Sequence, residues 1–539
     1  MRDPQPDPEG QALTRREFLS KGLRLAALAA LAPGSLSLLL SGCGGTRKRL
    51  GEELVRGSLA VALDADVQTL DPAMHRSRTV EAVVRNICDG LVTRDARMQY
   101  VPELAVGWEV QGEDRWVFTL REGVKFHNGD PFTAEDVKFT IDRIIGAIEG
   151  LPPSPRKDLL GPVVGAEVVD SHTVAIATDG PYPILHKKLV FQEICPKRYF
   201  ERVGPDEFAK KPVGAGPFRL VDWRPGERIV LERFDGYYGG SPEIPPVAPA
   251  PLPGVIFRPL EEAATRLASL AADEVGIAAN IPPDQASAVE DLPQARLSVA
   301  QGTRTHFVGM NCTRKPFSSP PLREAMRYAV DPKPIVDNFL LGRAKALPGM
   351  LVPIAFGWDS SLPAPKQDIG RARALLRKAG YGNRLQVTLD CESSDKRMAE
   401  AIAGSMRIAG VEAEVRVWKK DNLLNQLRRK ERDLFLTSWG NSSLDPSGIL
   451  PVLFRSDGYS NFFGYQNPQV DRLLQEADRA MNDAERAGKY VEVQRILHRD
   501  APTCFHFAIE ELYGVAKRVQ NFEARSDGML PMHDVSLTA

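Results

Sequence analysis

The chain has 539 residues, and its 69 lysines and arginines nearly balance its 70 aspartates and glutamates, so the formal net charge is −1. This balance argues against a general nucleic-acid-binding protein, which would carry a basic excess. The 44 glycines and 42 prolines stay below the share that indicates disorder, and six cysteines are too few for a disulfide scaffold in so long a chain. Composition names no function, but the length suggests three or four domain-sized units.

The first 43 residues resemble an export signal. Arg15 and Arg16 precede an apolar run over residues 25–40, which is shorter than the roughly 20 residues that a membrane-spanning helix needs. This pattern resembles a twin-arginine signal, and the Leu-Ser-Gly-Cys sequence that ends at Cys43 resembles a bacterial lipobox. The resemblance implies that residues 1–42 are a signal peptide and that the Cys43 thiol is lipidated; in the alternative interpretation the cysteine is incidental.

The other cysteines do not form a recognisable framework. Five follow Cys43, namely Cys88, Cys195, Cys312, Cys391 and Cys504. An odd number cannot all pair within the chain, and no two stand at metal-ligand spacing. We therefore favour buried unpaired thiols, and one disulfide stays open as an alternative for a chain outside the cytoplasm.

Motifs of catalysis are missing from the sequence. It contains no Gly-x-Ser-x-Gly elbow, no His-Glu-x-x-His, no Walker loop and no dinucleotide fingerprint, and its eight histidines are scattered. We expect no catalytic residues, no metal and no cofactor, and hence a binding protein instead of an enzyme.

Helix and strand patterns alternate along the chain. Residues 115–120 alternate as a half-buried strand, and Thr133 with Asp136 has the spacing of a helix capping box. The sequence predicts further strands at 228–231, 306–310 and 385–389. Apolar stripes with helical spacing predict three more helices, at 322–330, 372–379 and 470–477. The proline-rich segment 242–259 is predicted to be a surface connection. The pattern of the complete sequence predicts an α/β protein with at least two lobes.

One block identifies a family. The sequences PELAVGWEV, from Pro102, and RWVFTLREGVKFHNGDPFTAEDVKFT, from Arg115, closely resemble the signature region of family 5 solute-binding proteins. These are the peptide, dipeptide and nickel-type receptors of bacterial ABC importers. Further blocks carry the resemblance over residues 58–515, with local departures such as Cys88 where the family usually has Glu.

The resemblance implies a fold. It is the two-lobed α/β fold of periplasmic binding proteins (type II, cluster C), with an extra domain inserted in the first lobe and the ligand enclosed when the lobes close. The expected segments are a tether at 43–57, lobe I at 58–75, 166–303 and 515–539, the inserted domain II at 76–165, and lobe III at 304–514.

The same resemblance implies a function. We expect a lipid-anchored extracytoplasmic receptor that binds a peptide-sized ligand and delivers it to an ABC permease. It would work in the periplasm or at the outer face of the cytoplasmic membrane, or on the outer membrane, as a monomer without a nucleic-acid partner. The alternatives are a receptor for an opine, an oligosaccharide or a metal chelate, and a sensory or chaperone lipoprotein without a permease.

The segment that follows residue 433 bears on the ligand. In peptide-binding relatives an aspartate three residues after the tryptophan that matches Trp439 receives the peptide α-ammonium, and here that position is Ser442. A hydroxyl offers a hydrogen bond without the charge, which indicates altered amine recognition. Asp445, three residues further on, either caps a helix that begins at Ser447, which we favour, or contacts the ligand.

Other candidate ligand contacts are carried over from relatives. Trp418 and Trp439 match positions that line the cavity there, and their flat rings suit peptide side chains, sugars or cations, although both could instead pack in the hinge core. Gly440 and Asn441 belong to the same segment as Ser442, and Phe307 stands on the strand that enters the second lobe. No histidine falls between Trp439 and Pro446, which makes the metal-chelate alternative the least supported.

Overall fold

The protein is described by a computed structural model over residues 57–244, 248–382 and 384–538. The expected signal peptide 1–42, the expected lipidation site Cys43 and all of the tether except residue 57 lie outside these residues. Within the described residues, no helix is long and apolar enough to cross a membrane. All five cysteines after Cys43 are free thiols, and four of them are buried, as favoured from the sequence.

The first lobe is built on a seven-stranded sheet. Its strand order is β12-β19-β11-β1-β10-β9-β8, in which β1 runs parallel to β10 and β11 and the other neighbours are antiparallel. The strands are β1 (Leu59–Leu63), β8 (Phe218–Arg224), β9 (Arg228–Arg233), β10 (Gly254–Pro259), β11 (Ile277–Ala278), β12 (Ala295–Ala300) and β19 (Glu511–Ala516). The helices that accompany it are α3 (Arg78–Val84), α9 (Ala263–Ala271) and α10 (Ala286–Glu290).

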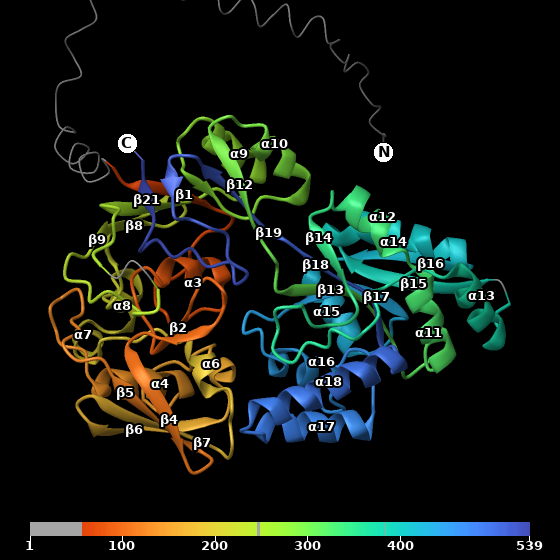
Figure 1. The fold of residues 1–539 in the computed structure, drawn as a ribbon, viewed down its shortest axis with the longest axis horizontal. Coiled ribbons are helices and arrows are strands. Elements are labelled where there is room, and N and C mark those ends of the chain that lie inside the picture. Colours follow the sequence, from red (N-terminus) through yellow and green to blue (C-terminus); the bar gives the residue numbers. More distant parts are fainter. Residues whose placement is uncertain (1–56, 245–247, 383, 539) are drawn as a thin grey trace, which may run out of the picture. The chain divides into compact units, whose positions relative to one another are not determined.

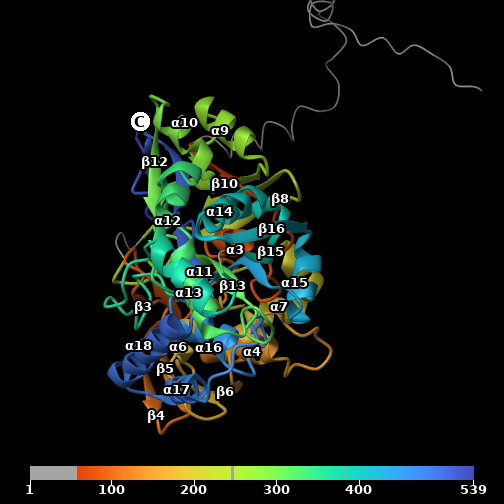
Figure 2. The ribbon, with the colours of Figure 1, turned by 90° about the vertical axis from the view of Figure 1, so that its right-hand side faces the viewer.

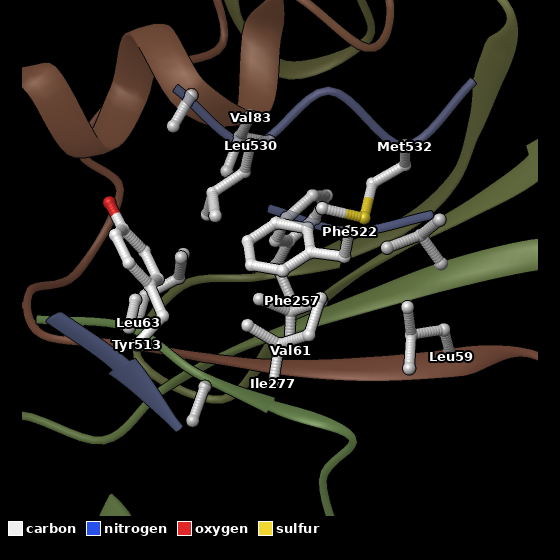
Figure 3. Close-up of a cluster of buried hydrophobic side chains, with 14 of the residues drawn as sticks. Leu59, Val61, Leu63, Val83, Phe257, Ile277, Tyr513, Phe522, Leu530 and Met532 are labelled. Atoms are coloured by element: carbon white, nitrogen blue, oxygen red, sulfur yellow. The ribbon is translucent and has the colours of Figure 1, made fainter. Parts of the chain in front are cut away.

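One apolar core holds this lobe together. Figure 3 shows Val61 of β1, Phe257 of β10 and Ile277 of β11 beneath Phe522 and Met532, which belong to the C-terminal part of the chain. All are nearly or fully buried. Because each large apolar side chain that is fully buried stabilises the fold by about 1.5–3 kcal/mol, these contacts fix the C-terminal segment onto the first lobe.

A small domain follows β1 in the sequence and carries a four-stranded antiparallel sheet of order β4-β5-β7-β6. Its strands are β4 (Ala105–Gln111), β5 (Arg115–Leu120), β6 (Val163–Asp170) and β7 (Thr173–Thr178), and a hairpin of β2 (Val92–Arg94) and β3 (Tyr100–Pro102) precedes them. The helices are α4 (Ala134–Ile145), α5 (Lys157–Leu160), α6 (Leu185–Leu189), α7 (Lys197–Val203) and α8 (Pro205–Lys210). Val137, Ile141 and Ile144 of α4 pack on the sheet.

The second lobe is built on a six-stranded sheet of order β14-β18-β13-β17-β15-β16, in which β15 runs parallel to β16 and β17. The strands are β13 (Arg304–Met310), β14 (Ala344–Leu347), β15 (Leu385–Glu392), β16 (Val411–Trp418), β17 (Leu434–Gly440) and β18 (Thr503–Ile509). The helices are α11 (Pro320–Ala329), α12 (Pro332–Pro334), α13 (Ile369–Lys378), α14 (Lys396–Ala409), α15 (Lys420–Arg428), α16 (Leu450–Phe454), α17 (Pro468–Arg479) and α18 (Asp483–Asp500).

Helices cover both faces of the second sheet. Val308 of β13 packs in one core with α11, α13 and α14, whereas its neighbour Phe307 packs in another with α15, α16, α17 and α18. Figure 2 shows α11, α13 and α14 grouped near β15 and β16. Because successive side chains of a strand point to opposite faces, one strand contributes to two cores.

The chain passes between the two large sheets twice. It leaves the first sheet after β12 to enter β13, and it returns from β18 to β19, so that both connections lie in the middle of Figure 1. Gly302 in the first connection meets Ile509 at the end of β18, and an added Cβ at Gly302 would stand 1.9 Å from the Ile509 carbonyl oxygen. The two connections therefore touch where only a glycine fits.

Most predicted elements are confirmed. The strand at 115–120 is β5, and the strands expected at 228–231, 306–310 and 385–389 lie within β9, β13 and β15. The three apolar stripes are the buried faces of α11, α13 and α17. The capping box of Thr133 and Asp136 is present at the start of α4, where the Asp136 carboxylate accepts from the Thr133 backbone N–H at 2.9 Å.

Two expectations differ from the strand pairing. The segment 242–259 is not only a surface connection, because its last residues form β10, which lies between β1 and β9 in the sheet. All prolines of the segment except Pro259 precede this strand, and Pro259 is its last residue, so the apolar run 255–257 is free to pair on both sides. The expected lobe boundaries also shift. Strand β7 (Thr173–Thr178), expected in lobe I, pairs with β5 of the small domain. Helix α3, expected in domain II, packs in the core of the first lobe. All of β19, most of which was expected in lobe III, belongs to the first sheet.

We predict that Gly302→Ala destabilises the protein by about 1–3 kcal/mol, because the new methyl group overlaps a backbone carbonyl that cannot move without separating the two connections. Differential scanning calorimetry of the purified chain would measure the fall in thermal midpoint.

Gly404→Ala is the matched control for this change. Gly404 lies inside α14 with no atom within 4 Å of the added Cβ, and alanine favours a helix interior. We expect Gly404→Ala to leave the midpoint unchanged or raise it. Equal midpoints for the two variants would contradict the tight approach at Gly302.

Candidate ligand-binding site

The loop after β17 is held in one conformation by its own polar side chains. The Ser443 hydroxyl donates to Asn441 Oδ1 at 3.1 Å, and the Asn441 backbone N–H donates to the Thr303 carbonyl oxygen at 3.2 Å. Leu444 adopts a left-handed conformation with φ of 54°. The loop therefore follows the path of the first connection between the lobes and then turns sharply into the next helix.

Asp445 ends this loop and is the most enclosed charge of the site. Its side chain is 0% exposed, and it caps the short 3₁₀ helix η4 (Pro446–Gly448) by accepting from the Ser447 backbone N–H at 3.1 Å. This confirms the capping interpretation. Arg486 of α18 donates to both carboxylate oxygens, one of them at 2.7 Å.

The ion pair of Asp445 determines its charge state. Burial alone would raise the pKa of Asp445, but the hydrogen bonds and positive charge of Arg486, together with the charge of Lys187, hold that pKa well below its usual value. The carboxylate is therefore ionised and already compensated within the protein.

Three side chains from outside the second lobe bind the loop by hydrogen bonds and an ion pair. Lys187 of α6 lies 3.3 Å from Asp445 Oδ2, and Arg94 of β2 donates from Nη1 to the Ser442 carbonyl oxygen at 2.5 Å. The Tyr100 hydroxyl of β3 donates to the Ser443 carbonyl oxygen. These contacts join the small domain and its hairpin to the second lobe across the cleft.

A cavity of about 280 Å³ lies beside this junction, and we call it the cleft cavity. The first lobe contributes Arg76, Ser77, Arg78, Glu81, Asp527 and Met529, the small domain contributes Arg156, Leu159 and Phe191, and the second lobe contributes Thr303, Arg304, Gly440 and Ser442. Residues of both lobes thus enclose one space, as a ligand site between closing lobes requires.

A buried charge network forms one wall of the cleft cavity. The Arg156 guanidinium donates to Glu81 Oε2 and, at 3.2 Å, to Glu193 Oε2. Burial and the nearby charge of Glu81 raise the pKa of Glu193 to about 8, although Arg156 and Arg85 oppose the rise. Burial also lowers the pKa of His75, 3.7 Å from Glu81, to about 4. At neutral pH one carboxyl of the pair is largely protonated, and the network is close to neutral.

The structure brings some sequence-predicted residues to the cavity and not others. Ser442 and Gly440 line it. Trp439 is half-buried, and its indole N–H donates to the Gly448 carbonyl oxygen at 2.9 Å. Trp418 is also half-buried and donates to Asp390 Oδ1 at 2.6 Å. Both rings pack against the core of the second lobe.

Two further candidates are held inside the second lobe. Phe307 is 0% exposed and packs against Phe463 with ring centroids 6.0 Å apart, so its position is that of a core residue. Asn441 is buried and accepts the Ser443 hydrogen bond described above. Asp445, with all its partners inside the protein, does not line the cavity either.

The arginines of the cavity could not be predicted from the sequence. Arg76, Arg78, Arg156 and Arg304 carry no motif and look like any of the 69 basic residues of the chain. One signal is position, since Arg304 stands two residues before the strand predicted at 306–310. A metal site has no counterpart in the structure: within residues 57–244, 248–382 and 384–538, no three His, Cys, Asp or Glu side chains are grouped to hold an ion.

Comparison with known proteins decides the family. Residues 99–461 match the profile described as "Bacterial extracellular solute-binding proteins, family 5 Middle". The chain belongs to this family. The family 5 assignment agrees with the resemblance read from the sequence, and members of the family are binding proteins of transporters that act in the periplasm.

Individual relatives support the family 5 fold and a receptor role. The chain is 28% identical to the glutathione-binding protein GsiB of Shigella flexneri over 461 residues, which cover 82% of this chain and 87% of the relative. The structure of HbpA2 from Haemophilus parasuis superposes with a TM-score of 0.82 at 22% identity, covering 89% of this chain and all of that one. DppA from Helicobacter pylori, solved in complex with the peptide STSA, gives 0.73 at 24% identity, with coverages of 90% and 98%. This family 5 protein therefore has the two-lobed type II fold, and it is a solute-binding protein.

We predict that Arg486→Met destabilises the fold by about 3–5 kcal/mol, because it leaves the buried Asp445 carboxylate with Lys187 alone. The thermal midpoint at pH 7 would measure the loss. Lys333→Met is the control, since the Lys333–Asp337 pair lies at the surface, where the lysine side chain is 80% exposed and solvent screens the interaction. A midpoint for Arg486→Met as high as that of the control would refute the compensating role of Arg486.

The Glu193 carboxyl predicts a pH dependence. Its pKa in the folded protein, about 8, lies above the ordinary value of roughly 4.3, so its protonated form stabilises the fold and this contribution is lost as pH rises from about 5 to about 8. We expect Glu193→Gln to remove that loss, so that the variant gains in thermal midpoint over the wild type as pH rises from 5.5 to 8.5.

Glu167→Gln serves as the control for this series. Glu167 pairs with Arg115 at the surface, where the Glu167 side chain is 72% exposed. Its midpoints should run parallel to those of the wild type. If the Glu193→Gln curve ran parallel too, Glu193 would titrate normally.

Proposed function

We propose that this protein is a lipid-anchored extracytoplasmic receptor that binds a short peptide in the cleft cavity and delivers it to an ABC import permease. The observation that carries the proposal is a cavity enclosed by residues of both lobes, next to the loop 440–445 that the small domain grips. Closure of two lobes around a ligand is the event that a permease can recognise.

The size of the cavity favours a short ligand. Its volume of about 280 Å³ lies near the lower end of the roughly 300–1,000 Å³ typical of small-molecule sites. The name of the GsiB relative, a glutathione-binding protein, supports a ligand of tripeptide size. Trp439 and Trp418 are half-buried at the C-terminal ends of β17 and β16, and they are candidates for contact with ligand side chains when the lobes open or reclose.

The proposed lipid anchor is inferred from the sequence motif that ends at Cys43. Lipidation at Cys43 would tether residues 57–539 to a membrane surface through a short segment, and stable attachment of this kind needs more than one acyl chain. Trp439, Trp418, Gly440 and Ser442 are the proposed ligand contacts; Asn441, Asp445 and Phe307 would act by shaping the loop and the core behind them.

A ligand panel tests the proposal. Differential scanning fluorimetry of the purified chain would use glutathione, di- to pentapeptides, octopine, maltotriose and a nickel–histidine chelate. We expect a short peptide to raise the thermal midpoint, because a ligand at 100 times its Kd stabilises the folded state by about 2.7 kcal/mol. A shift with octopine, maltotriose or the nickel chelate and none with any peptide would reject the peptide assignment.

A further inference from the structure

Positively charged side chains outnumber negatively charged ones around the cleft cavity. Four arginines and two acids, Glu81 and Asp527, face it. Both acids are already paired, since Glu81 binds Arg156 and Asp527 lies 3.1 Å from Arg525 Nε. Burial would raise the pKa of Asp527, but the charges of Arg525 and Arg94 and a hydrogen bond from Arg525 hold that pKa well below its usual value. Neither carboxylate is left over for a cationic ligand.

Arg304 differs from the other arginines of the cavity. Within the described residues no carboxylate lies within 4.0 Å of its guanidinium, whereas Arg76, Arg78 and Arg156 each have an acidic partner. Arg304 Nη1 donates a hydrogen bond to the Ser438 hydroxyl at 3.2 Å. The side chain is exposed to the cavity, so its remaining N–H groups can donate to a ligand.

Backbone geometry makes room for the Arg304 guanidinium. Arg304 and Gly440 are paired residues of β13 and β17, and an added Cβ at Gly440 would stand 3.0 Å from Arg304 Nη2. Glycine at this position lets the planar group lie flat over the strand end beside Ser442. A guanidinium placed in this way presents its fork of donors, which fits a carboxylate.

A second cation strengthens the field at this point. Burial lowers the pKa of Arg304 and the positive charge of Arg78 lowers it further, whereas the charge of Glu511 opposes the shift. Arg78 comes from α3 of the first lobe and is partly neutralised by Glu511 at 2.7 Å. Two guanidinium groups from opposite lobes therefore face the same space, and an anion between them would relieve their repulsion and hold the lobes together.

We propose that the ligand is bound through a carboxylate, with Arg304 as its principal donor, and that recognition of an α-ammonium is secondary. This inference rests on the proposed function and names the ligand chemistry of the same site. The Ser442 hydroxyl brings no charge to the cavity, and the Asp445 carboxylate is already paired with Arg486 and Lys187. The cavity thus offers much to an anion and little to an ammonium group.

The test compares chemically matched probes on the full chain by isothermal titration calorimetry. The probes are glutathione, octopine and three forms of one tripeptide. These forms are Ala-Glu-Ala, N-acetyl-Ala-Glu-Ala, and Ala-Gln-Ala with an amidated C-terminus, which carries no carboxylate. We expect N-acetylation to change the affinity by less than about threefold. Removal of the carboxylates should weaken it at least about tenfold, since a charge-assisted hydrogen bond is lost.

Variants assign the effect to Arg304. Arg304→Gln should weaken binding of the carboxylate-bearing probes at least about tenfold without changing the thermal midpoint of the ligand-free protein. Arg219→Gln, which removes an equal charge from the surface pair with Glu232, should bind as the wild type does. Ser442→Asp should shift preference toward probes with a free α-ammonium.

The outcomes separate this inference from the proposed function. Tight binding of a peptide that survives amidation but not N-acetylation would overturn the inference and leave the peptide receptor intact. Binding of octopine alone, lost in Arg304→Gln, would overturn the peptide assignment and support the carboxylate site. Binding of no carboxylate-bearing probe, or equal binding by Arg304→Gln, would overturn the inference.

Discussion

The buried carboxylate of Asp445 is the interaction on which the arrangement of the cleft depends. An ionised carboxylate without water is tolerated only when positive charge and hydrogen-bond donors surround it. Here the donors come from α18, from α6 of the small domain and from the helix that Asp445 itself caps. Satisfying this one charge therefore brings together elements that are far apart in the sequence, and it fixes the loop that faces the ligand.

The position of that loop limits the groups that it presents to the cleft cavity. Its backbone carbonyls are taken by Arg94 and Tyr100, so the groups it leaves for a ligand are the Ser442 side chain and the open space above Gly440. Arg304 fills part of that space from the neighbouring strand. Because charge acts more strongly where water is scarce, the guanidinium groups that line the cleft cavity have more effect there than they would have at the open surface.

Local sequence predicted what depends on neighbouring residues. The capping box at Thr133 and the apolar stripes of α11, α13 and α17 need only i, i+3 and i+4 relations, and all of them occur in the structure. Strand β10 was missed since the prolines before it dominate the pattern of segment 242–259, although a sheet accepts a strand that begins after them. The boundaries between lobes were misplaced for a related reason. Pairing of β7 with β5 is a long-range event that no local pattern records.

The sequence by itself determined the family, the α/β class and the main helices and strands, because each depends on residues that are close together along the chain. Tertiary structure alone decided which charges meet. Asp445 finds Arg486 at a separation of 41 residues and Lys187 at 258, and Arg304 of one lobe faces Arg78 of the other. Electrostatic interactions depend on distance in space and on exclusion of water, and neither quantity is encoded in the order of residues along the chain.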